Sequence, residues 1–123
     1  MTDFCHNCYN LKTLIMNSSG SGCVNAFANC YNLTTVTNKL PVGNRAFFNC
    51  YKLTTIPTTA VSASGTGAVS MFNNCSNLTT LPTSITVSNG AGMFDNCIRI
   101  TSAPATMSVG RASNLFRNCT NLV

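Results

Sequence analysis

Cysteine and histidine have the most reactive side chains in this 123-residue chain, and one segment places them close together. Cys5, His6 and Cys8 form a C-x-x-C spacing with a histidine inside it, which is the spacing of half a zinc site or of a redox pair. A structural zinc site needs four ligands, and no second C-x-x-C or H-x-x-x-H follows in the sequence. We therefore expect no metal site and no cofactor, and we interpret the segment as an irregular copy of a repeat in which Cys8 takes part.

Acid–base catalysis is not expected, because titratable residues are scarce. The chain has one histidine, two isolated aspartates and no glutamate, so a general acid–base pair cannot be assembled. The glycine-rich segments also lack the Gly-Lys-Ser/Thr ending of a phosphate-binding loop. The sequence predicts a protein that is not an enzyme.

Charged residues make up only 7% of the chain, so the polar surface must come from its 17 Thr, 17 Asn and 12 Ser. The net charge of +5 is spread over single cations and does not form the basic stripe that phosphate binding requires. No apolar stretch approaches the roughly 18 residues that span a bilayer. These features argue against a nucleic-acid partner and against membrane insertion.

The chain is an internal repeat. The motif Phe-x-Asn-Cys occurs five times, and a sixth, degenerate copy ends at Cys8 with Cys5 in the place of phenylalanine. The cysteines of the six copies fall at positions 8, 30, 50, 75, 97 and 119, so the copies are 20 to 25 residues apart. Steps of about 22 residues that vary in this way indicate variable loops on a fixed scaffold.

Apolar residues recur at every third position of each copy and give the consensus F-x-N-C-x-x-L-T-T-L-P. This period predicts a short helical turn that carries Phe and Cys, followed by a very short strand through Leu-Thr-Thr-Leu. Pro57, Pro82 and Pro104 are expected to end that strand, because proline has no amide hydrogen to donate. The segment 85–87 is a candidate second strand, and the Gly/Ser/Asn-rich segments between copies predict turns.

One such unit has too little apolar surface to fold alone, so its Phe, Cys and Leu must be covered by the units on either side. We therefore predict a repeat solenoid with short strands stacked into a parallel sheet. Residues 1–123 then form a single array of five to six units. Both ends lie inside a motif without a polar capping unit, which predicts either an excerpt of a longer chain or a unit that stacks end to end.

The pattern Phe-x-Asn-Cys-x-x-Leu-Thr-x-Leu-Pro at this step resembles the BspA-like leucine-rich repeats, found in surface proteins of host-associated bacteria and of some anaerobic protists. The resemblance covers essentially the whole chain. It implies a leucine-rich-repeat-like solenoid and an extracellular or cell-surface location, with a virion surface as the alternative. Members of the family resemble one another in scaffold and differ in what they bind, so the resemblance names no ligand.

Two rows of side chains are predicted to form the core of the solenoid. The cysteines share one repeat position in an apolar row, so we expect buried free thiols, with occasional disulfides between neighbouring copies as the open alternative. The predicted core ladder comprises Cys8, Cys30, Cys50, Cys75, Cys97, Cys119, Phe27, Phe47, Phe72, Phe94 and Phe116.

An asparagine precedes the ladder cysteine in every copy. Its side-chain amide both donates and accepts, so we expect this row to satisfy backbone groups that are left unpaired where each coil turns. A ligand-binding amide row is the alternative. The row comprises Asn7, Asn29, Asn49, Asn74, Asn96 and Asn118.

The position after the ladder cysteine is expected to point away from the core, and it gathers three tyrosines with basic residues beside them. Rigid amphipathic rings beside Asn and Lys suit contact with a protein or a glycan on a host or neighbouring cell, whereas the structural alternative is that the tyrosines stack to cover the rod. A second hypothesis is a fibre or a virion or tail appendage that self-associates end to end. The predicted contact residues are Tyr9, Tyr31, Tyr51, Lys52 and Arg99.

Overall fold

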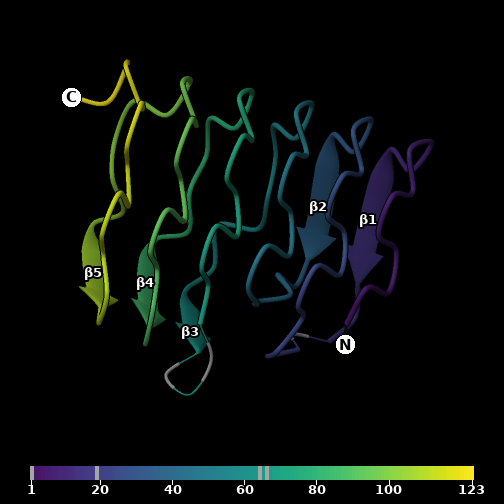
Figure 1. Cartoon of the computed structure of the whole chain (residues 1–123), viewed down its shortest axis with the longest axis horizontal. Helices are drawn as coiled ribbons and strands as arrows, with labels where there is room; N and C mark the ends of the chain where they lie inside the picture. Colours follow the sequence, from purple (N-terminus) through teal and green to yellow (C-terminus); the bar gives the residue numbers. More distant parts are fainter. Residues whose placement is uncertain (1, 19, 64, 66) are drawn as a thin grey trace.

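The computed structural model describes residues 2–18, 20–63, 65 and 67–123 and shows a solenoid whose coils lie side by side along one axis (Figure 1). The strands of this part of the chain pair in parallel within two separate sheets, and each pair joins strands of adjacent coils. One sheet pairs β1 (Thr13–Met16) with β2 (Thr35–Asn38). The other has the order β3 (Val61–Ala63), β4 (Ser84–Val87) and β5 (Thr106–Val109). The predicted solenoid with short parallel strands is confirmed.

The two sheets form at different points of the coil, and proline explains the difference. β1 and β2 begin five residues after the ladder cysteine of their coils, whereas β4 and β5 begin nine residues after theirs. Ile15 and Thr37, which lie seven residues after the cysteine, are inside β1 and β2. The same position holds Pro57, Pro82 and Pro104 in the next three coils. Because proline cannot donate to a ladder, the strand forms beyond it.

The predicted strand through Leu-Thr-Thr-Leu is therefore only partly right. The second coil has a strand there, the third coil has only an isolated bridge between Thr35 and Thr55, and the fourth and fifth coils have none in their described residues. The candidate second strand at 85–87 falls within β4.

The predicted helical turns are wrong, because the Phe-x-Asn-Cys segments form successive turns closed by hydrogen bonds between residues three apart, and no helix occurs among the described residues. The amide of Cys30 donates to the carbonyl of Phe27 at 3.3 Å. Every second amide leaves the coil, so Phe27 N donates to Ala46 O at 2.8 Å and Asn29 N donates to Phe48 O at 2.8 Å. A helix would keep these amides within one coil, and the left-handed backbone at Asn29 (φ 60°) interrupts a helical path.

The core contains a column of phenylalanine rings that runs along the solenoid. Successive ring centroids are 5.3–5.5 Å apart, and neighbouring planes are within 14° of parallel. The first four rings are fully buried and the last is half-buried. Offset aromatic pairs add about 0.5–1.5 kcal/mol each beyond the area they bury. The column comprises Phe27, Phe47, Phe72, Phe94 and Phe116.

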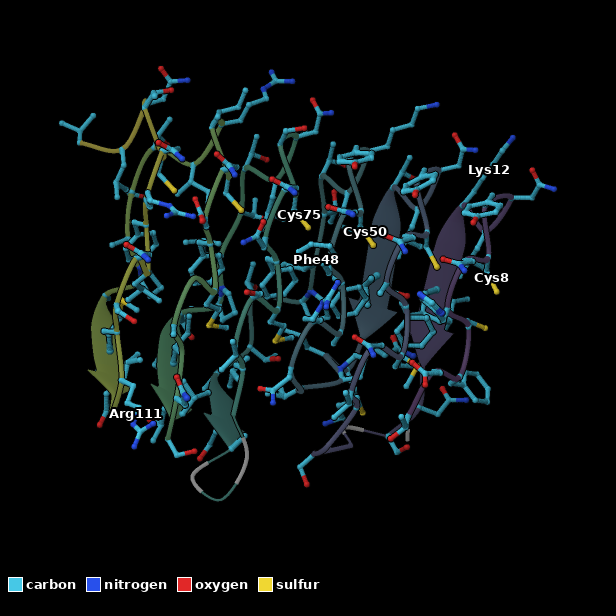
Figure 2. The ribbon with its side chains drawn as sticks, viewed as in Figure 1. Cys8, Lys12, Phe48, Cys50, Cys75 and Arg111 are labelled. Carbon is cyan, nitrogen blue, oxygen red and sulfur yellow. The ribbon has the colours of Figure 1, made fainter. Side chains whose placement is uncertain are left out.

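A row of cysteines runs beside the phenylalanine column, and Cys50 and Cys75 lie at the same level in adjacent coils (Figure 2). From the second coil onward, each thiol of the row donates to a carbonyl of the preceding coil, as Cys50 Sγ does to Phe27 O and Cys75 Sγ does to Phe47 O, both at 3.2 Å. All eight cysteines are free thiols, so the structure contains no bridge between copies. Cys8 is half-buried, and the buried members of the row are Cys30, Cys50, Cys75, Cys97 and Cys119.

Candidate functional site

The asparagine row occupies a backbone position that few side chains tolerate. Its six members have φ between 60° and 64°, inside the left-handed region. A left-handed residue brings Cβ close to the following carbonyl, and asparagine accepts this conformation more readily than most residues because its short polar side chain bonds locally. The motif needs asparagine here because each coil turns at this point.

The side chains of this row bond to one another rather than to the backbone, which corrects the predicted role. Each Nδ2 donates to the Oδ1 of the preceding coil at 2.8–3.0 Å. The nearby backbone amides are already used, since Asn49 N donates to Asn73 O of the next coil at 2.9 Å. The amide groups of the inner coils therefore pair along the solenoid, as in a hydrogen-bonded chain, with one N–H and one oxygen lone pair of each amide used in the row.

A pair of substitutions at Asn74 separates the backbone role from the amide role. Both Asn74→Ala and Asn74→Gly remove the amide bonds to Asn49 and Asn96, but only glycine adopts the left-handed backbone without strain. We expect the alanine variant to be about 1 kcal/mol less stable than the glycine variant, the reverse of their order in a helix. Urea unfolding followed by circular dichroism measures the difference, and equal stabilities would contradict the conformational role.

The tyrosines form a second aromatic column, on the outside of the solenoid. Ring centroids of Tyr9 and Tyr31 are 5.2 Å apart and those of Tyr31 and Tyr51 are 5.3 Å apart, with interplanar angles of 17°. The same side chains keep 37–49% of their surface exposed. Partial desolvation in the stack, together with the neighbouring phenols, raises the pKa of Tyr31.

The basic residues beside the tyrosines are held by asparagines of the preceding coils. Asn32 Nδ2 donates to Tyr9 O at 2.7 Å, and Lys52 Nζ donates to Asn32 Oδ1 at 2.8 Å. The arrangement recurs two coils further on, where Asn77 donates to a tyrosine carbonyl at 2.7 Å and Arg99 donates to Asn77 Oδ1 at 3.3 Å. Tyr9, Tyr31, Tyr51, Lys52 and Arg99 thus share one exposed surface, which we call the tyrosine face.

The tyrosine face is positively charged, because the acids of the chain lie elsewhere. Asp95 is buried to 2% exposure and accepts hydrogen bonds from Arg117, one of them from Nε at 2.9 Å. This bond to Asp95 raises the pKa of the Arg117 guanidinium. In the described ranges, neither Lys52 nor Arg99 forms an ion pair. An anionic group on a partner would therefore meet unneutralised cations.

The C-x-x-C segment shows no arrangement that would hold a metal. Cys5 and Cys8 are half-buried free thiols, and His6 is exposed, with its Nε2 3.4 Å from Asn29 Nδ2. Burial, followed by the neighbouring Cys8, raises the pKa of the Cys5 thiol and disfavours the thiolate that metal binding or nucleophilic attack requires. Within the residues that the structure describes, no group of three or more His, Cys, Asp or Glu gathers in one place.

The family of the chain follows from the repeat and its columns. The family model of the BspA-type leucine-rich repeat region matches six copies over residues 2–123. The chain belongs to the BspA-type leucine-rich repeat family. No curated protein and no solved structure matches the chain.

Membership of the BspA-type family limits the range of functions. Repeats of this type are generally non-catalytic modules of protein interaction, and the proteins that carry them are typically associated with surfaces. In the part of the chain that the structure describes, no helix is long and apolar enough to cross a membrane. The Asp95–Arg117 pair is an additional feature that the sequence motif alone did not single out.

Proposed function

We propose that this BspA-type repeat array is a non-catalytic recognition module at a cell surface, which uses the tyrosine face to bind a protein or a glycan of a host or neighbouring cell. The observation that carries the proposal is the half-exposed stack of three tyrosines beside cations that lack an acidic partner among the described residues. Tyrosine and arginine are the residues that contribute most often and most strongly to interfaces.

Stacking determines which parts of the tyrosine rings are accessible to a partner. The accessible parts favour a protein over a glycan as the partner. Both faces of Tyr31 are covered by the neighbouring rings, so its edge and its hydroxyl are what remain exposed. A sugar ring packs against an aromatic face, whereas a protein surface supplies carbonyls for the hydroxyls and side chains that meet ring edges. The stack also reduces the entropy that the rings lose on binding, because they are already ordered.

The binding role predicts the effect of a triple substitution. The Y9A/Y31A/Y51A variant is expected to bind the surface of partner cells at least about tenfold more weakly than the native chain. The measurement is retention of the labelled protein on a panel of intact animal and bacterial cells by flow cytometry. Protease treatment of the cells is expected to abolish retention, whereas periodate oxidation of their glycans is expected to leave it.

One control variant distinguishes binding from folding, and a second variant tests the cations. The T79A/T80A/T101A variant changes three exposed threonines outside the tyrosine face and is expected to bind like the native chain. The K52Q/R99Q variant keeps the stack and is expected to bind more weakly than the native chain. The difference between the two is expected to be largest at low salt, where the charges are least screened. Full retention by the triple tyrosine variant would refute the tyrosine face as the binding surface.

A further inference from the structure

The solenoid changes width between its second and third coils. Only 20 residues separate Cys30 from Cys50, whereas 25 separate Cys50 from Cys75. The additional residues carry β3 past the point where the shorter second coil turns back, and Figure 1 shows β3 lying below the arrowhead of β2. In the described part of the chain, β3 therefore has no paired strand in the coil before it.

This step leaves β3, one of the two edge strands of the three-stranded sheet, without a described strand beside it in the second coil. Among the described residues β3 pairs with β4 alone, and a groove of about 410 Å³ lies on its other side, lined by residues 59–63 and by Gly20, Ser21, Lys39, Leu40 and Val42. Earlier in the third coil the neighbouring backbones are joined, as where Thr54 N donates to Thr34 O at 3.0 Å. Across the described residues of the groove, no backbone hydrogen bond joins 57–63 to the second coil.

The register shows which backbone groups face the groove. Val87 O accepts from Gly110 N at 3.1 Å, so the backbone groups of Val87 are directed toward β5 and those of Thr86 toward β3. Thr86 lies opposite Ser62 in the register. In a parallel ladder, the backbone groups of a residue that point toward the neighbouring strand bond to the residues before and after its partner, and not to the partner itself. The amide and the carbonyl of Ser62 are therefore turned away from β4, into the groove.

The side chains around this edge define the kind of segment that fits. Val61 and Ala63 are buried beneath the sheet, whereas the Ser62 side chain is exposed, so the alternation of a strand continues up to the edge. Lys39 is the one charged residue among the described residues that line the groove. A main-chain amide and carbonyl beside a lysine are complementary to an extended backbone that carries a carboxylate.

We propose that this groove binds an extended, acidic polypeptide segment of a partner protein, which adds to β3 as a further parallel strand. The amide and carbonyl of Ser62 supply the main-chain bonds, and Lys39 attracts the carboxylate. The parallel orientation continues the order β3, β4 and β5 in the sheet. This site is separate from the tyrosine face. It lies at the edge of β3, whereas Tyr51 of the same coil directly follows Cys50.

The test uses the whole chain and a labelled peptide that copies residues 82–89, with one aspartate added at each end. This probe is suitable because the same residues contain β4, which pairs with β5 in the required parallel sense. Binding is measured by fluorescence anisotropy, and the site is located by amide chemical shifts. We expect binding that weakens several-fold without the aspartates or at high salt, and none when alternate amides of the peptide are N-methylated.

Two substitutions at one residue decide the proposal. Ser62→Pro removes the amide that faces the groove while leaving the register with β4, and it is expected to weaken peptide binding at least about tenfold. Ser62→Ala removes only the side chain and is expected to bind like the native chain. The Y9A/Y31A/Y51A variant is expected to keep peptide binding, so failure of the tyrosine face and failure of this site are distinguishable.

Three outcomes would overturn the proposal. One is equal binding by the native chain and the Ser62→Pro variant, provided that both unfold at the same temperature. Another is a set of shifted amides confined to the tyrosine face. A third is a concentration-dependent dimer of the native chain that Ser62→Pro converts to a monomer, which would make a second copy of this chain the occupant.

Discussion

Replacing Phe72 with alanine is expected to lower the free energy of unfolding by about 3–5 kcal/mol. The ring is fully buried and stacks on Phe47 at 5.4 Å and on Phe94 at 5.5 Å, so its loss removes two aromatic contacts and leaves a cavity between coils. Each coil of a solenoid packs only on its neighbours. The surrounding coils cannot collapse into the gap without breaking the hydrogen bonds that join them, such as that from Phe72 N to Met93 O at 2.8 Å.

The matched control is Phe4→Ala, at the other extreme of burial. Phe4 is 64% exposed and meets Phe27 edge-on, with ring centroids 6.2 Å apart. Its removal is expected to cost less than about 1 kcal/mol. Urea unfolding of both variants gives the comparison directly. A loss below 1 kcal/mol at Phe72, or equal losses at the two positions, would mean that the phenylalanine column does not hold the coils together.

The columns of the solenoid were readable from the sequence because every coil places the same repeat position at the same point in space. A phenylalanine that recurs at Phe27, Phe47 and Phe72 must therefore stack on its own copies, whatever the length of the loops between them. The same reasoning places the tyrosines in one exposed row. The sequence left open whether they stack or bind a partner, and the structure shows a stack whose rings remain half exposed.

The local backbone was harder to predict, because a period of three fits both a tight helix and a series of turns. The left-handed asparagines decide for turns, and their presence before every ladder cysteine was the available signal. The position of the strands was also readable in principle. Proline seven residues after the cysteine moves the strand onward, while Ile15 and Thr37 at that position allow it to form earlier.

The Asp95–Arg117 pair shows what comparison of copies can add. Both residues follow the motif phenylalanine directly, in adjacent copies, so the solenoid brings them together although they are 22 residues apart. Opposite charges at one repeat position of neighbouring copies are therefore a signal for an ion pair. The uncovered edge of β3 had no comparable signal, because it depends on how loops of different length turn back in space.

Alkaline solution is expected to unfold this protein through its buried thiols. Burial raises the pKa of Cys30 from the ordinary 9.0 to about 11, and it raises the pKa of Cys50, Cys75 and Cys97 as well. In the unfolded chain these thiols ionise near 9, whereas in the folded chain they stay protonated. Above pH 9 the folded state therefore binds more protons than the unfolded state, and stability falls as the pH rises.

The expected slope is large because several thiols act together. Each thiol contributes up to about 1.4 kcal/mol per pH unit above its unfolded pKa, so four of them contribute about 5 kcal/mol per unit. A domain of ordinary stability, about 5–15 kcal/mol, is then expected to unfold within roughly one to three pH units above 9. The stabilisation is fully present below pH 9 and is lost progressively up to pH 11 and beyond.

Urea unfolding between pH 8 and pH 11, with reductant present throughout, measures this slope. The Cys75→Ala variant is expected to lose up to about 1.4 kcal/mol per pH unit of it, because one buried thiol is gone, even though its stability at pH 8 is also lower. The slope, rather than the midpoint, is therefore the diagnostic quantity. The Y9A/Y31A/Y51A variant is expected to keep the slope between pH 9 and pH 10, because tyrosines in the unfolded chain ionise only near pH 10. A slope unchanged in Cys75→Ala would assign the alkaline transition to groups other than the cysteine row.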